Sequence, residues 1–245
     1  MNWLKRRESR PFFLYLPFNA PHTPIQDPDA RGTAEWRNGH RPTYAKMVER
    51  MDSKIGTVLA QLDAMGAAGN TIVVFLSDNG ADPNGSNGAL RGRKSSLFEG
   101  GVRVPCMARW PEALPAGGTI DQVALTMDWF PTLLSAVGIG KPKEPRFDGI
   151  DLMPFLKSGR RASPRLVFWR YKRGDRVRKA ARDGDLKYIS DAGEEFVFDL
   201  ARDERESDNL LKSMPGRAAS LKAKLADWER DVMAPRLKPF RSEPG

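Results

Sequence analysis

Residues 71–80 read Thr71-Ile72-Val73-Val74-Phe75-Leu76-Ser77-Asp78-Asn79-Gly80. An apolar, β-branched run with almost no polar interruption predicts a strand that is buried on both faces, as the strands of parallel sheets are. Ligands of open α/β folds bind just beyond the carboxyl ends of such strands. Asp78 and Asn79 stand at that place as two hard oxygen donors suited to calcium or magnesium, although Asp-Asn-Gly is also good chemistry for a simple turn.

The preceding segments place this strand in a βαβ pattern. Residues 12–16 are a short apolar run that we expect to be a buried strand, and His22 follows it. Residues 44–65 carry apolar side chains three and four positions apart, which predicts an amphipathic helix. Strand, helix and strand in this order predict a parallel sheet with a right-handed crossover. His22 and the Asp78-Asn79 pair should therefore open on the same edge of that sheet.

A glycine-rich loop follows the strand, between about residues 81 and 101, and its length is more typical of a functional loop than of a connector. It contains Lys94, and we expect Glu99 and Arg103 to brace it by an ion pair. The segment after it, 102–110, predicts another strand, with Cys106 in the core. His40 is expected to be an exposed loop residue.

The pattern changes beyond about residue 145. Short apolar runs at 166–169, 187–189 and 196–200, separated by charged turns, predict an antiparallel sheet, and a last helix should follow Pro215. Before that change, Asp128 is expected to cap a helix that Gly138 ends. We therefore predict two domains: an α/β part over residues 1–145 and a small α+β subdomain over residues 146–245.

The composition and net charge of the chain indicate which kinds of binding partner to expect. The chain has 245 residues, 40% of them hydrophobic, and a formal net charge of +9, so a packed globular protein is expected. Eleven basic residues and one acid lie in 157–182, a stretch that could attract a polyanion, form a solvated face or complement an acidic partner. No nucleic-acid motif accompanies it, so no nucleic-acid partner is expected.

The cysteine count and the hydropathy pattern argue against a disulfide-bonded, a cysteine-rich zinc-binding or a membrane-spanning protein. The single cysteine excludes an internal disulfide and a cysteine-rich zinc site. No run has the length of a transmembrane helix, so no membrane span is expected. The apolar run at 12–16 is too short for the core of a signal peptide, and localisation cannot be read from this end.

The order and spacing of the motifs resemble the sulfatase family of the alkaline-phosphatase-like superfamily. The resemblance extends over nearly the whole chain. The segments that carry it are Phe12 through Leu16, Ala20-Pro21-His22-Thr23-Pro24, Ser77-Asp78-Asn79-Gly80, Asn87 through Lys94, Phe98 through Pro105, Arg109-Trp110-Pro111, Met127 through Leu134, Asp148 through Leu152, Ala181 through Tyr188 and Phe198-Asp199-Leu200.

The resemblance implies a fold, an activity and a site. The fold is a partial alkaline-phosphatase-like α/β sandwich with a mostly parallel sheet, followed by a small antiparallel-sheet-plus-helix subdomain. The activity is that of a sulfuric-ester hydrolase acting on a sulfate ester, such as a sulfated polysaccharide. Asp78 and Asn79 match two calcium ligands, with Mg²⁺ a less suitable ion. Lys94 and His22 match residues that contact the sulfate group and serve in catalysis. The family implies a periplasmic or secreted location.

The chain departs from the family at the nucleophile. Sulfatases make a formylglycine from a Cys/Ser-x-Pro-x-Arg motif, but Cys106 is followed by Met107-Ala108-Arg109. Neither a nucleophile nor the Asp-Asp pair that completes the calcium site is found here. The chain therefore resembles the carboxyl-terminal half of a sulfatase. We expect it to be inactive alone and to expose a sheet edge that invites association.

Two other functions stay open. A phosphodiesterase or phosphonate hydrolase of the same superfamily would use a similar site, because sulfate and phosphate have similar shape and charge. A non-catalytic fragment that binds polyanions through residues 157–182 would instead show steeply salt-dependent binding without turnover.

Overall fold

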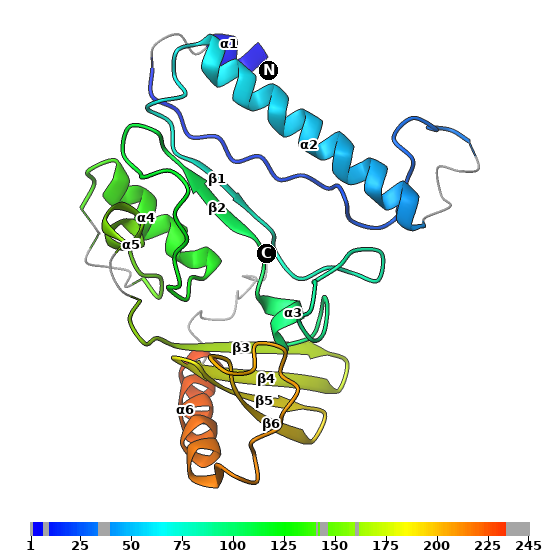
Figure 1. The fold of residues 1–245 in the computed structure, drawn as a ribbon, viewed down its shortest axis with the longest axis vertical. Coiled ribbons are helices and arrows are strands. Elements are labelled where there is room, and N and C mark those ends of the chain that lie inside the picture. The colour runs from blue at the N-terminus through cyan, green and yellow to red at the C-terminus, as the bar shows by residue number, and fades with distance from the viewer. Residues whose placement is uncertain are drawn as a thin grey trace, which may run out of the picture. The chain divides into compact units, whose positions relative to one another are not determined.

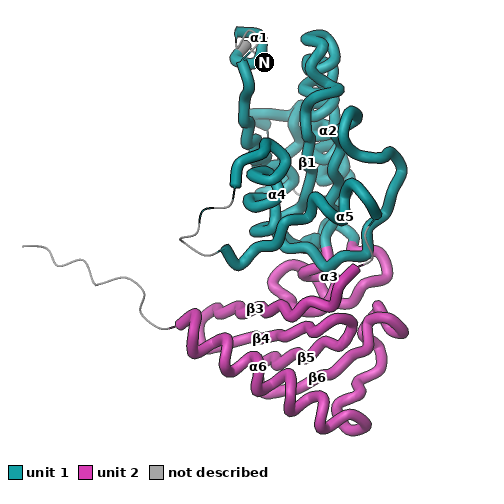
Figure 2. The backbone as a smooth tube through the Cα atoms, turned by 90° about the vertical axis from the view of Figure 1, so that its left-hand side faces the viewer, with its two compact units in different colours: residues 1–86, 104–161 teal, residues 87–103, 162–245 magenta. Residues whose placement is uncertain are grey.

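The computed structural model describes residues 2–6, 10–33, 40–140, 142, 147–159 and 162–233. The chain forms two compact units (Figure 2). Unit 1 consists of residues 1–86 and 104–161, and unit 2 consists of residues 87–103 and 162–245. The units are interleaved in the sequence, since the loop that contains Lys94 belongs to unit 2. The predicted domain division, 1–145 and 146–245, stays a prediction.

Unit 1 contains a two-stranded antiparallel sheet. The run at 71–76 does form a strand, β1 (Val73–Leu76), and the segment 102–110 forms β2 (Cys106–Arg109). Val73 pairs with Arg109 and Leu76 with Cys106. The mostly parallel sheet is not confirmed, because the described strands of this unit run antiparallel and β1 is only half-buried.

Residues 12–16 do not form the predicted buried strand. They belong to neither sheet of the described chain, and Phe13 and Tyr15 are 75% and 77% exposed. A strand exists only through hydrogen bonds to a neighbouring strand, and among the described residues no strand pairs with this segment. The prediction was wrong because an apolar run indicates what a segment can bury, not what lies beside it.

The predicted amphipathic helix is confirmed as α2 (Arg41–Ala64), the long helix of Figure 1. His40 precedes it and is exposed, as expected. Gly66 follows it with φ +62°, a left-handed conformation that glycine adopts without steric cost. The preceding helix α1 (Asn2–Arg6) is short. None of the helices in the described chain is long and apolar enough to cross a membrane.

A buried carboxylate organises the rest of unit 1. Asp128 is fully buried and accepts hydrogen bonds from the Leu125 N–H at 2.6 Å and the Ile150 N–H at 2.8 Å. The expected cap is therefore wrong in detail, since Asp128 makes no capping bond to its own helix and joins the preceding turn to residue 150. The elements it joins are η2 (Thr126–Asp128), α4 (Trp129–Ala136) and α5 (Met153–Ser158).

Unit 2 contains the predicted antiparallel sheet and last helix. Its strand order is β3-β4-β5-β6, and α6 packs against β4 and β5 (Figure 1). Strand β4 was not foreseen, because its sequence is rich in Arg and Lys. The elements are β3 (Leu166–Arg173), β4 (Arg176–Asp183), β5 (Leu186–Asp191), β6 (Glu194–Asp199) and α6 (Pro215–Met233).

The sheet of unit 2 has an apolar core on each face. Side chains alternate between faces along a strand, so neighbouring residues point in opposite directions. One core joins Ala181, Tyr188 and Val197 to Leu221 and Leu225 of α6.

The other core joins the adjacent strand residues Ala180, Ile189 and Phe198 to Leu97, with Phe98 packed against it. This second face is therefore covered by the segment 87–103, which includes the short helix α3 (Glu99–Val102). The loop that carries Lys94 is part of the packing of unit 2.

We predict an acid-side loss of stability at Glu195. The Lys222 ammonium, and then the Tyr188 hydroxyl, hold the pKa of Glu195 below its ordinary 4.5. The stabilisation is present above the unfolded value and is lost as pH falls from about 4.5 through the folded pKa. Because the pair is close to solvent, we expect less than about 1 kcal/mol.

Urea unfolding at pH 7 and pH 3 measures this effect. In Glu195→Gln the free energy of unfolding should depend less on pH than in the wild type. The exposed neighbour Glu194→Gln is the control, and an unchanged pH dependence in Glu195→Gln would contradict the assignment.

Candidate functional site

The Asp78-Asn79 turn follows β1 directly, as the sequence predicts. The Ser77 N–H bonds the Pro105 carbonyl at 3.1 Å, and the Ser77 hydroxyl donates to the Asn79 carbonyl at 2.9 Å, so the turn is anchored at its start. Asp78 is exposed. The Asn79 Nδ2 amide donates to Asp78 Oδ2 at 2.6 Å, which brings the two side chains together.

The Asp78 and Asn79 side chains offer the kind of oxygen ligand that calcium takes, but they are too few to complete a calcium site. A carboxylate and a carboxamide oxygen are ligands that calcium takes, yet it takes six to eight of them. Among the described residues there is no cluster of three or more His, Cys, Asp or Glu placed to hold a metal. To offer both oxygens to one ion, the Asn79 amide must turn its Oδ1 where its Nδ2 now faces the carboxylate.

His22 lies in an exposed turn between two cis-prolyl bonds, Ala20–Pro21 and Thr23–Pro24. Its Nδ1 is 2.7 Å from the Thr23 carbonyl oxygen. A carbonyl oxygen only accepts, so Nδ1 carries the proton, and in the neutral ring Nε2 holds a lone pair. Nε2 can therefore donate to an anionic oxygen only when the ring is a cation.

Lys94 belongs to unit 2, on the segment that covers the sheet. It is half-buried, and it forms no ion pair with any residue in the described part of the chain. The following residue, Ser95, has φ +71°, which is uncommon for a residue other than glycine. The ammonium of Lys94 thus lies on a tightly folded turn without a counterion among the described residues.

A buried ion cluster anchors this segment to the sheet. Lys187 on β5 is fully buried and lies 2.8 Å from Glu99 Oε1 and 2.9 Å from Glu206 Oε1. The Glu99 N–H donates to Glu206 Oε2 at 2.5 Å. Arg182 stands 3.8 Å from Glu99 and balances the second negative charge. The pKa of Glu206 is raised, mainly by burial.

The expected partner of Glu99 was wrong. Arg103 instead pairs with Glu204 at 3.2 Å, near solvent, while Glu99 turns inward to Lys187. An ion pair does brace the loop, but no local pattern indicates that Lys187, inside an apolar strand, is the partner. Cys106 also differs from its prediction, since it lies on β2 but is exposed.

Two glycines make the Lys94 turn compact. A Cβ on Gly100 would lie 2.5 Å from the Gly92 carbonyl oxygen and 2.6 Å from that of Arg91. A Cβ on Gly101 would collide with the carbonyl oxygens of Ser96 and Arg93. Side chains at these positions would push α3 away from residues 90–96, so only glycine allows this packing.

The basic stretch 157–182 is substantially paired. Five of its members form ion pairs with acids of β5, α3, α6 and the turn before β5. Pairing within the chain was not among the three alternatives, and it leaves fewer free cations in this stretch for a polyanion. The five are Arg170, Arg176, Arg178, Lys179 and Arg182.

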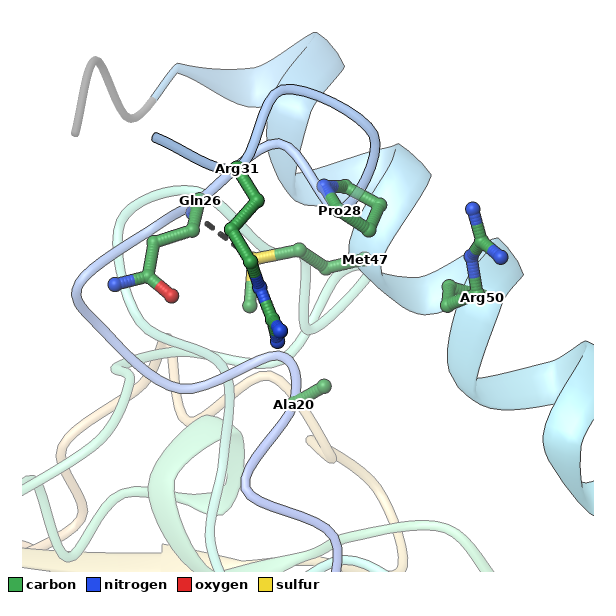
Figure 3. A pocket seen from close by; sticks show the side chains of 6 residues that line it. All are labelled: Ala20, Gln26, Pro28, Arg31, Met47 and Arg50. Atoms are coloured by element: carbon green, nitrogen blue, oxygen red, sulfur yellow. Dashed lines mark hydrogen bonds between the residues drawn. The ribbon is translucent and has the colours of Figure 1, made fainter. Parts of the chain in front are cut away.

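A shallow pocket of about 320 Å³ lies in unit 1 between α2 and the chain after His22 (Figure 3). Arg31 extends along it toward Ala20, whereas Arg50 is engaged by Asp29. The Gln26 N–H contacts the Met47 sulfur at 3.3 Å across its wall. The pocket offers one cation without a partner in the described chain, which alone selects no ligand.

The candidate site residues thus fall into two groups. Asp78, Asn79 and His22 belong to unit 1, where only Asp78 and Asn79 contact each other, and Lys94 belongs to unit 2. The roles assigned to the four residues stay predictions. Sequence reasoning missed Ser95, Lys187 and Glu206, for which local pattern carries no signal.

The sequence profile of the family described as Sulfatase matches residues 1–139. The chain belongs to the sulfatase family. A second profile, "N-sulphoglucosamine sulphohydrolase, C-terminal", matches residues 93–231. The two matches together extend over most of the chain, as the order of motifs predicts.

Curated sulfatases are more than a third identical to this chain over the aligned residues. It is 39% identical to mouse steryl-sulfatase over 180 residues, which is 69% of this chain and 28% of that protein. It is 38% identical to dog N-acetylgalactosamine-6-sulfatase over 184 residues, 71% of this chain and 34% of that protein. The chain therefore spans about a third of the length of these relatives.

Solved structures give the same picture of the fold. The structure of Ps i-CgsB in complex with k-i-k-neocarrahexaose has a TM-score of 0.83 and 26% identity, and the match covers 96% of this chain and 58% of that one. This sulfatase chain accordingly has the fold of part of a larger protein.

We predict that Lys187→Met lowers the free energy of unfolding by about 3–5 kcal/mol, because it leaves two buried carboxylates without their ammonium. The loss should shrink as pH falls, since a protonated Glu206 no longer needs a counterion. Urea unfolding across pH 4–7 measures it, with Lys172→Met on an exposed part of β3 as the control. A loss equal to that of the control would contradict the assignment.

Proposed function

We propose that this sulfatase-family chain supplies the sulfate-contacting lysine and histidine, and two calcium ligands, to a sulfuric-ester hydrolase. The observation that supports it most is the match of residues 1–139 to the sulfatase profile, which contains all four candidate residues. Lys94 also has the chemistry for the role, as a cation on an anchored turn that forms no ion pair with any described residue.

Lys94 and His22 would act on the sulfate group by charge and hydrogen bonding. The ammonium of Lys94 would stabilise negative charge on the sulfuryl oxygens, most strongly where it increases in the transition state. His22 would donate from Nε2, because its Nδ1 proton is committed to the Thr23 carbonyl. Its contribution therefore requires the protonated ring.

Asp78 and Asn79 would hold part of a calcium site, with Mg²⁺ the less suitable ion. A bound divalent cation supplies positive charge that polarises the sulfuryl oxygens. The two side chains would orient that cation at the end of β1. Further ligands, and the nucleophile, would come from outside the part of the site that this chain supplies.

A sulfated carbohydrate is the substrate class that we propose. Among the curated relatives, N-acetylgalactosamine-6-sulfatase is named for a sulfated sugar, and the structure with 26% identity was solved with a hexaose. Steryl-sulfatase is a relative of similar identity, 39% against 38%, so the substrate test must include a sterol sulfate. A phosphate ester must also be included, because it tests the alternative of a phosphodiesterase or phosphonate hydrolase.

We predict that the purified chain does not hydrolyse an aryl sulfate, and that it binds calcium with a Kd of about 1 mM or weaker because it offers two of the six or more ligands. Calorimetric titration measures the binding, and release of 4-nitrophenol measures turnover. Asp78→Ala should abolish the residual binding. Metal-dependent turnover by the chain alone would contradict the proposal.

We also predict the effects of substitutions in a parent sulfatase, meaning any longer protein that contains this chain and a nucleophile. Lys94→Ala should lower kcat by about 10²- to 10³-fold, through lost transition-state stabilisation. Asp78→Ala should abolish activity through loss of the metal.

The neighbouring exposed cation provides a matched control for Lys94. Arg93→Ala should leave kcat/KM for a sulfated sugar unchanged. Equal losses in Arg93→Ala and Lys94→Ala would mean that general charge, and not the position of Lys94, matters. Preference for a phosphate ester over every sulfate ester would support the alternative hydrolase.

A further inference from the structure

The turn that carries Lys94 is held in an unfavourable backbone conformation. Ser95 adopts φ +71°, where its Cβ crowds the backbone, and such conformations persist only when surrounding contacts fix them. The contacts that fix this one come from the sheet of unit 2. They add to the hydrogen bonds that the turn makes within itself, such as the one from the Ser96 N–H to the Arg93 carbonyl.

Arg178 on β4 makes a direct contact with this residue. Its Nη1 donates a hydrogen bond to the Ser95 carbonyl oxygen. Its Nε is held by both carboxylate oxygens of Asp191, at 3.1 and 3.0 Å. The Arg178 guanidinium, which Asp191 holds in place, therefore hydrogen-bonds the residue that follows Lys94.

The other end of the turn is fixed independently. The Glu99–Lys187–Glu206 cluster anchors α3, and the Gly100 N–H bonds the Arg91 carbonyl at 2.7 Å. Between these anchors, the Ser96 N–H closes the turn on the Arg93 carbonyl at 2.8 Å. Lys94 therefore lies between a buried anchor and the contact from Arg178.

We propose that Arg178 is a positioning residue that holds the Lys94 turn in its strained conformation and so fixes where the Lys94 ammonium is presented. Arg178 does not itself contact the sulfate group in this proposal. The inference about catalysis rests on the proposed function of Lys94, whereas the anchoring of the turn does not.

The neighbouring Arg176 offers a matched control. It lies on the same strand and bonds the same partner, Asp191, with its Nη2 at 2.8 Å. Among the described residues, its side-chain hydrogen bonds and ion pair are to Asp191 and not to the Lys94 turn. Replacing Arg176 removes an equivalent ion pair of Asp191 but leaves the hydrogen bond from Arg178 to the Ser95 carbonyl.

The first experiment measures amide hydrogen exchange at Ser96 in this chain, because the Ser96 N–H closes the turn next to the Arg178 contact. Arg178→Met should accelerate exchange about 10- to 100-fold, the range for losing a hydrogen bond from a charged donor. Arg176→Met should change it by no more than about twofold. Unchanged exchange in Arg178→Met, or equal acceleration in both variants, would overturn the proposal.

The second experiment measures turnover in the parent sulfatase. Arg178→Met should lower kcat about 10- to 100-fold with a smaller change in KM, and Arg178→Lys should restore part of it, because an ammonium can still donate to the Ser95 carbonyl. In a Lys94→Ala background, Arg178→Met should cause no further loss, since residues that act through one another are not additive.

The outcomes separate the two proposals. Faster exchange with normal turnover in Arg178→Met would support the anchoring but overturn positioning for catalysis, whereas normal turnover in Lys94→Ala would contradict the role of Lys94 in sulfate binding. Full additivity of Arg178→Met and Lys94→Ala would overturn positioning through Lys94, even if exchange is accelerated.

Discussion

The Glu99–Lys187–Glu206 cluster is the interaction on which unit 2 depends. A lysine without solvent exposure is stable only when its charge is paired, and here two carboxylates, one from residues 87–103 and one from the chain after β6, meet it. Both carboxylates are paired with the same buried ammonium. If one of the three segments moved away, it would leave a buried charge without its partner. The cluster thus ties a distant loop to the sheet.

The same segment serves packing and chemistry. Leu97 and Phe98 bury one face of the sheet, and Arg91 stacks on the Phe98 ring at 4.1 Å. Lys94 stands a few residues away without a counterion in the described chain. An exposed loop would let a lysine sample many positions, whereas a loop that forms part of a core presents it in one. This arrangement explains why Ser95 remains in an unfavourable conformation.

The spacing of apolar residues predicted those helices and strands whose own sequence shows the pattern. The apolar spacing in α2 and α6 and the short runs of β3, β5 and β6 all gave the correct element type. These sequence patterns gave the wrong result where a strand depends on the strands that pair with it. Residues 12–16 have the composition of a strand but no pairing strand in the described chain, while β4, rich in arginine and lysine, is a strand because β3 and β5 pair with it.

The sequence by itself determined the family, the turn at Asp78-Asn79 after a strand, and the candidate lysine and histidine, because ordered motifs and residue chemistry are local properties. Only the tertiary structure decided that β1 pairs antiparallel with β2, that Glu99 bonds Lys187 and not Arg103, and that Arg178 reaches Ser95. These contacts join residues as many as 88 positions apart. Their formation depends on burial and backbone path, which no local pattern encodes.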